Sequence, residues 1–194
     1  MTRHWLAALA LGVVIAAGAA TSCSSGDDDG RKSVTRIPEP DDVPESKISE
    51  SLMLALGQAK NFHHKANVYL QDGNVDAAIA AVREILSIEW PAGAPEAQDV
   101  MFDARARLGK LLLGAGQYEE ALRVVDEGIA SATRDSYFLA NLYTVRGEIL
   151  EAAAPNETDP EAAKKMRHDA IEALDRSTAM QLAIQRQLAK EMGL

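Results

Sequence analysis

Histidine is the residue type in this chain best suited to binding a metal or transferring a proton, and it occurs at His4, His63, His64 and His168. His63 and His64 are adjacent in a segment with helical spacing. Their side chains therefore point about 100° apart, unlike a metal-binding pair four residues apart. No serine nucleophile elbow, glycine-rich phosphate loop or paired-carboxylate motif accompanies them. We therefore expect no enzyme, no metal site and no cofactor.

The single cysteine, Cys23, cannot form an internal disulfide, and the segment before it has a composition of its own. Arg3 lies near the start, an apolar run follows over residues 5–20, and small residues precede the cysteine. A basic start, an apolar core of about 15 residues and small residues before a cleavage site predict a secretory signal peptide over residues 1–22. The apolar core is shorter than the roughly 20 residues that a membrane-spanning helix needs.

The residues directly before the cysteine, Ala20-Thr21-Ser22, together with Cys23 resemble a bacterial lipoprotein box. The resemblance implies that Cys23 carries acyl chains such as palmitate and becomes the first residue of the mature protein. Because Ala20 stands where leucine is usual, plain secretion with a free Cys23 and an uncleaved anchor stay open as alternatives. Ser24, rather than aspartate, follows the cysteine. Resemblance to sorted lipoproteins then implies an outer-membrane location facing the periplasm, if the source is a diderm bacterium.

The composition changes twice after the cysteine. Residues 23–45 are rich in Ser, Gly, Asp and Pro, and they have too little apolar surface to offset the entropy of ordering, so we expect a disordered tether. From residue 46 onward, apolar residues recur three or four positions apart, and period-two apolar runs are absent. We therefore expect an all-α domain over residues 46–194. The net charge of −9 argues against nucleic acid as the main partner.

Turn signals divide this domain into three expected helical hairpins. In the first hairpin we expect a cap at Ser46 or Ser49, a turn at residues 72–74 and a second helix over Val75–Glu89. In the second, Pro95 opens the third helix, Gly114 and Gly116 break it, and the fourth helix runs from Tyr118 to about Ser131. In the third, the fifth helix begins at Tyr137, a loop covers residues 154–160, and the last helix runs from Pro160 to about Met192. We expect Leu182, Ile184 and Leu188 to cover the open end of the array.

The spacing of small and aromatic residues in these hairpins resembles the tetratricopeptide repeat (TPR), most closely in the stretch from Arg105 to Leu122. Small residues such as Gly109 and Ala121 fit positions where two antiparallel helices approach closely. The resemblance implies a right-handed superhelical array of about three antiparallel hairpins with a long C-terminal capping helix, and it implies protein binding. The residues that carry it are Ala66, Tyr69, Gly73, Ala78, Leu108, Gly109, Gly116, Tyr118, Ala121, Gly147 and Ala170.

In TPR arrays the first helix of each hairpin lines a groove that binds extended peptides, so the resemblance also implies a set of groove residues. The matching positions are Lys60, His63, His64, Asn67, Asp103, Arg107 and Lys110. The three cations among them predict a locally positive groove that receives an acidic segment or a C-terminal carboxylate. The alternative is that three cations on exposed helices share a face by chance.

These features together predict a membrane-anchored scaffold or adaptor of the bacterial cell envelope. Its partners would be envelope proteins whose identity the sequence does not specify. Two alternatives to the scaffold stay open. The first is a solute-binding helical domain of the envelope, and the second is an envelope enzyme. A closed apolar pocket would favour the solute-binding domain, and a buried cluster of titrating residues would favour the enzyme. An open groove would favour the scaffold.

Overall fold

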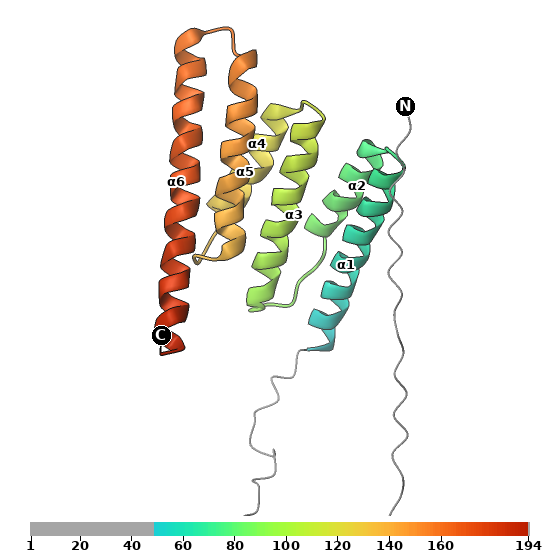
Figure 1. Ribbon diagram of the computed structural model, residues 1–194. Helices are drawn as coiled ribbons and strands as arrows, with labels where there is room; N and C mark the ends of the chain where they lie inside the picture. The colour runs from blue at the N-terminus through green and yellow to red at the C-terminus, as the bar shows by residue number, and fades with distance from the viewer. Residues whose placement is uncertain (1–48, 194) are drawn as a thin grey trace, which may run out of the picture. The chain divides into compact units, whose positions relative to one another are not determined.

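The computed structural model describes residues 49–193, and every regular element within that range is a helix (Figure 1). The elements are α1 (Glu50–Gln71), α2 (Val75–Leu86), α3 (Pro95–Gly114), α4 (Tyr118–Ala130), α5 (Tyr137–Ala153), the short 3₁₀ helix η1 (Ala154–Asn156) and α6 (Pro160–Glu191). The prediction of an all-α fold is confirmed. None of these helices is both long and apolar enough to cross a membrane. The predicted signal peptide, the tether and Cys23 lie outside the described residues.

Short polar side chains cap several of the helices at their first turns. The Ser49 hydroxyl accepts a hydrogen bond from the Leu52 amide at 3.2 Å, so Ser49 caps α1. Asp159 caps α6 in the same way, and Pro160 occupies the first helical position, where its missing N–H costs nothing. These local signals explain why the beginnings of α1 and α6 could be predicted from the sequence.

Two glycines end the first helices of the first two hairpins. Gly73 and Gly116 have φ angles of +72° and +73°, a conformation that residues with a side chain rarely adopt. The predicted break at Gly114 and Gly116 is confirmed, because α3 ends at Gly114 and Gly116 follows with a positive φ. The second helix is shorter than predicted and ends at Leu86 instead of Glu89. There the Ser87 hydroxyl donates to the Glu84 carbonyl at 2.8 Å, which satisfies a helix-terminal acceptor.

The six α-helices pair as three antiparallel hairpins, α1 with α2, α3 with α4, and α5 with α6. The helix α3 also packs against α2 and α5, and α4 packs against α5, so each hairpin is joined to the next. The first helices α1, α3 and α5 run in the same direction (Figure 1). A single hairpin buries only one face, and this stacking buries the other. The arrangement is a TPR-like helical repeat array.

Glycine allows the closest approaches between helices in this array. A Cβ atom added at Gly109 of α3 would lie 2.8 Å from Val125 Cγ2 of α4 and 3.2 Å from Val145 Cγ1 of α5. At Gly147 of α5 it would lie 2.8 Å from Leu174 Cγ of α6. The other small residues of the predicted repeat pattern, Ala66, Ala78, Ala121 and Ala170, are buried, as is Leu108, while Tyr69 and Tyr118 are half-buried against the core.

The last helix, α6, begins and ends close to the predicted residues but covers the array less completely than expected. Met180 is buried in the core, and Ile184 packs against it. Leu182 and Leu188, which we expected to cover the open end, are each 45% exposed. The correction has a simple cause, because α6 has 32 residues and α5, its main packing partner, has only 17.

Candidate functional site

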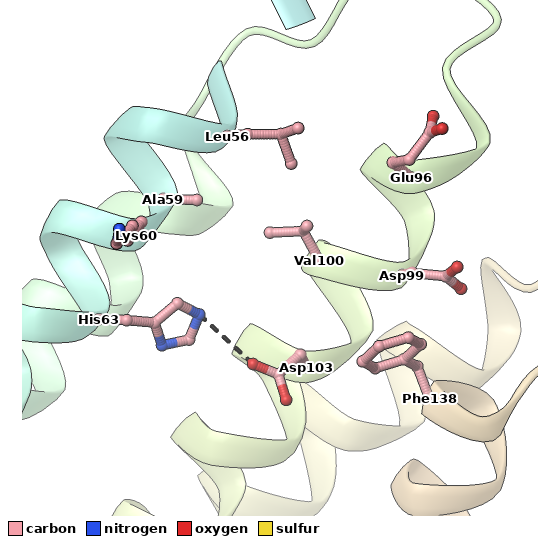
Figure 2. A pocket seen from close by; sticks show the side chains of 9 residues that line it. All are labelled: Leu56, Ala59, Lys60, His63, Glu96, Asp99, Val100, Asp103 and Phe138. Carbon is pink, nitrogen blue, oxygen red and sulfur yellow. Dashed lines mark ion pairs between the residues drawn. The ribbon is translucent and has the colours of Figure 1, made fainter. Parts of the chain in front are cut away.

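A surface pocket of about 530 Å³ lies between α1 and α3, close to the start of α5. Its lining residues are Leu56, Ala59, Lys60, His63, Glu96, Asp99, Val100, Asp103 and Phe138 (Figure 2). All of them come from the first helices of the three hairpins. The repeat spacing therefore determines the pocket, because it places the same helix of each hairpin on the same side of the array.

Apolar side chains form the walls of this pocket. Leu56 of α1 and Val100 of α3 face each other across it, and Phe138 of α5 closes one side (Figure 2). The Phe138 side chain is 40% exposed, so it is only partly covered by the described part of the chain. An aromatic ring exposed beside an apolar hollow is typical of a surface that another molecule covers.

The acidic groups of the pocket all come from α3. Glu96, Asp99 and Asp103 follow one another at intervals of three and four residues, which places them on one side of the helix. Arg134, in the loop before α5, binds Oδ2 of Asp99 at 2.6 Å, while Oδ1 of Asp99 is buried without a hydrogen-bond partner among the described residues. Within residues 49–193, Glu96 forms no ion pair.

His63 connects the acidic pocket to the basic part of the same surface. Its Nε2 lies 3.4 Å from Oδ2 of Asp103, and its Nδ1 lies 3.0 Å from Nη1 of Arg107. A guanidinium can only donate hydrogen bonds, so Nδ1 accepts and the proton of the neutral ring is on Nε2. Burial lowers the pKa of His63 below 6.5, although Asp103 acts in the opposite direction, and Arg107 lowers the pKa further. Near neutral pH the imidazole is therefore uncharged and leaves the charge of Asp103 uncompensated.

Arg107 of α3 binds α1 through several hydrogen bonds. Nη2 donates to Oδ1 of Asn67 at 2.6 Å, and Nη1 donates to the backbone carbonyl of His63 at 3.2 Å. These bonds join the first two hairpins across the predicted groove. Replacing Arg107 by glutamate would therefore disturb the α1–α3 contact as well as the charge of the surface, so that substitution tests binding poorly.

The structure thus brings together only some of the predicted groove residues. His63, Asn67, Asp103 and Arg107 form one connected cluster between α1 and α3. Lys110 instead forms an ion pair with Glu148 of α5 at 3.4 Å. Lys60 lies at the pocket and forms no ion pair with the described residues.

Six residues of this site were not predicted from the sequence, namely Leu56 and Ala59 of α1, Glu96, Asp99 and Val100 of α3, and Phe138 of α5. The three on α3 could have been found from their spacing with Asp103, because residues separated by three, four and seven positions share a helix face. Phe138 left no comparable signal. It belongs to the next hairpin, and only the packing of α5 against α3 brings it to the pocket.

Comparison with known proteins supports the repeat assignment. Residues 69–145 match the family model of the tetratricopeptide repeat. The matched segment runs from the end of α1 to the middle of α5 and contains the whole α3–α4 hairpin. TPR domains bind protein partners and are typically non-catalytic scaffolds. No curated protein and no solved structure matches the chain.

A metal centre finds no support in this TPR-like array. Within residues 49–193 no group of three or more His, Cys, Asp or Glu side chains is placed to hold a metal ion. The pair His63 and Asp103 supplies only two potential ligands, and Arg107 occupies the remaining ring nitrogen of His63. The side chains that line the pocket supply apolar contact, hydrogen bonding and ion pairing.

Proposed function

We propose that this protein is a membrane-anchored interaction scaffold of the bacterial cell envelope and that it binds a segment of a partner protein along α1, α3 and α5. One observation carries the proposal: an open pocket with apolar walls lies on the face that the first helices share. The family match supports it, because TPR repeats mediate interactions between proteins. An extended segment lying across the first helices would cover Phe138 and Val100.

The membrane anchor in this proposal rests on the sequence. Cys23 follows a predicted signal peptide and a lipoprotein-like box, and about 25 residues separate it from the first described helix. A chain of that length spans roughly 25 to 30 Å on average, which is enough to hold the array clear of lipid headgroups. In a diderm bacterium the proposed location is the outer membrane, facing the periplasm.

Site-specific photo-crosslinking in the native cell tests the scaffold function. A photoreactive phenylalanine analogue in place of Lys60 lies at the pocket, and the same analogue in place of Glu119 lies on α4, outside this pocket. We expect the Lys60 position to trap discrete protein partners that the Glu119 position does not trap. Identical products at the two positions, or none at Lys60, would refute the proposal.

Metabolic labelling with palmitate tests the anchor separately. We expect the wild-type protein to incorporate label and the Cys23→Ala variant to incorporate none. Label on both proteins, or on neither, would contradict acylation at Cys23 and leave the binding function unaffected.

An apolar solute is the second candidate ligand, because a volume of about 530 Å³ lies within the usual range of small-molecule sites. Native mass spectrometry of the purified protein distinguishes the two functions. A bound small molecule that is lost in a Val100→Trp variant, which fills the pocket, would favour solute binding over the scaffold function.

A further inference from the structure

The pocket between α1 and α3 has an unequal distribution of charge that bears on what it binds. Three carboxylates of α3 line it, whereas Lys60 is the one lining side chain with a permanent positive charge. Arg134 neutralises Asp99. Glu96 and Asp103 remain as negative charges that are not neutralised. Glu96 has no ion-pair partner within residues 49–193, and Asp103 faces His63, which is uncharged near neutral pH.

Two of the three predicted cations of this surface are already engaged, and Lys60 is the third, without an ion pair among the described residues. Arg107 donates to His63 and Asn67, and Lys110 is paired with Glu148. An acidic segment would find only Lys60 without an ion pair, whereas a basic segment would meet two carboxylates, Glu96 and Asp103, that no Lys or Arg of residues 49–193 pairs with. Charge complementarity therefore favours a cationic partner at the α1–α3 pocket.

The geometry also limits the length of the segment that the pocket recognises. Residues 96 and 103 are seven positions apart on α3, which corresponds to about 10 Å along the helix axis. An extended peptide covers that distance with about three residues. The apolar wall formed by Leu56, Val100 and Phe138 lies within the same interval.

We propose that the pocket receives a bulky apolar side chain of a partner segment and that Glu96 and Asp103 bind a Lys or Arg within two positions of it. This inference rests on the proposed scaffold function and specifies the chemistry of its partner. It replaces the acidic segment or terminal carboxylate that the repeat pattern implied. The apolar contact would supply most of the affinity, and the carboxylates would select the charge of the partner.

Selection of a random peptide library displayed on phage against the full-length chain tests this inference. We expect the enriched peptides to combine a large apolar residue with a nearby Lys or Arg. Fluorescence polarisation with the most enriched peptide then measures its Kd. The double variant Glu96→Gln with Asp103→Asn should raise that Kd roughly threefold to tenfold, as expected for two exposed ion pairs.

A matched pair of substitutions controls for the loss of charge. Glu119→Gln with Asp175→Asn removes the same charge from exposed positions on α4 and α6 and should leave the Kd unchanged. Phe138→Ala should also weaken binding severalfold, whereas Ile171→Ala, at a 58% exposed position on α6, should not. Because Phe138 is itself 40% exposed, its removal should leave the protein folded.

Two results would overturn the inference. One is enrichment of acidic peptides or of peptides that require a free C-terminal carboxylate. The other is a Kd that the Glu96 and Asp103 substitutions do not change. The crosslinking experiment at Lys60 distinguishes this failure from failure of the scaffold function. If the analogue at Lys60 traps discrete protein partners, only the inference about partner chemistry fails. If it traps none, the scaffold function fails as well.

Discussion

At the scale of single residues, Gly109 shows how closely the helices of this array approach one another. Val125, the nearest neighbour of a Cβ atom added there, is buried and β-branched, so it has little freedom to move aside. We predict that Gly109→Ala lowers the free energy of unfolding by about 1 to 3 kcal/mol, as overpacking of a core does. Chemical denaturation monitored by circular dichroism measures the change.

Gly57 provides a matched control for that substitution. It lies inside α1, and a Cβ atom added there meets nothing within 4 Å. Gly57→Ala should therefore stabilise the protein by about 0.5 to 1 kcal/mol, the difference in helix propensity between the two residues. Equal effects at the two positions would show that propensity, and not close packing, determines the outcome at Gly109.

The protonation of His63 should make stability depend on pH. The pKa of His63 lies below 6.5 in the folded state, chiefly because of burial, so the unfolded chain binds more protons between the folded pKa and about 6.5. The free energy of unfolding should therefore decrease as pH falls through this window. Denaturation midpoints at a series of pH values measure the slope.

We expect a His63→Gln variant to have a shallower slope in that window. A His64→Gln variant, which removes the exposed neighbour, should retain the wild-type slope. Protonation of His63 also removes the acceptor that Arg107 uses, so the loss of stability has a structural origin in the α1–α3 contact. An unchanged slope in His63→Gln would contradict this explanation.

At the scale of elements, α6 divides into a packed part and an exposed part. Met180 is buried and Ile184 is half-buried, whereas Leu188 and Met192 are 45% and 67% exposed. We predict that a stop codon in place of Arg186 changes the free energy of unfolding by less than about 0.5 kcal/mol. Met180→Ala, in contrast, should cost about 2 to 5 kcal/mol. Urea denaturation of both variants tests the difference, and a large loss on truncation would mean that the end of α6 stabilises the array.

The boundaries of the elements were predictable where a local signal exists. Such signals act through a residue's own backbone or through a neighbour within three residues. The helices begin or end as expected at four of them, Ser49, Gly73, Pro95 and Pro160. The end of α2 was predicted three residues too late, because the apolar pattern continues beyond Ser87 although the helix does not.

At the scale of the whole molecule, the core is continuous from Ala59 in α1 to Met180 in α6. Neighbouring hairpins that share one core should unfold together. Trp90, in the loop between α2 and α3, packs against that core and reports on the junction of the first two hairpins. We predict that its fluorescence and the helical circular dichroism signal change at the same denaturant concentration.

If the purified protein retains residues 1–22, the cooperativity experiment needs a Trp5→Phe background, because the full chain has two tryptophans, Trp5 and Trp90. A fluorescence transition at lower denaturant than the loss of helix would show that the first hairpin separates early. That result would show that the core shared by the first two hairpins does not make them unfold together.

The helical class, the three hairpins and most of their boundaries follow from local features of the sequence. Helical periodicity, caps and turn glycines are local properties, and they act within one or two turns of the residues that carry them. Repeat spacing also predicted His63, Asn67 and Arg107 as groove residues, because it identifies which face of each first helix lines the groove.

The character of the candidate site, in contrast, depends on how the hairpins pack against one another. Whether a surface cation is available depends on its neighbours from other hairpins, and packing placed Glu148 beside Lys110 and Asn67 beside Arg107. The same packing brought Phe138 to the carboxylates of α3. A groove expected to be positive therefore contains an apolar pocket with an acidic side, because ion pairing depends on distances in space that the spacing of residues along one helix does not specify.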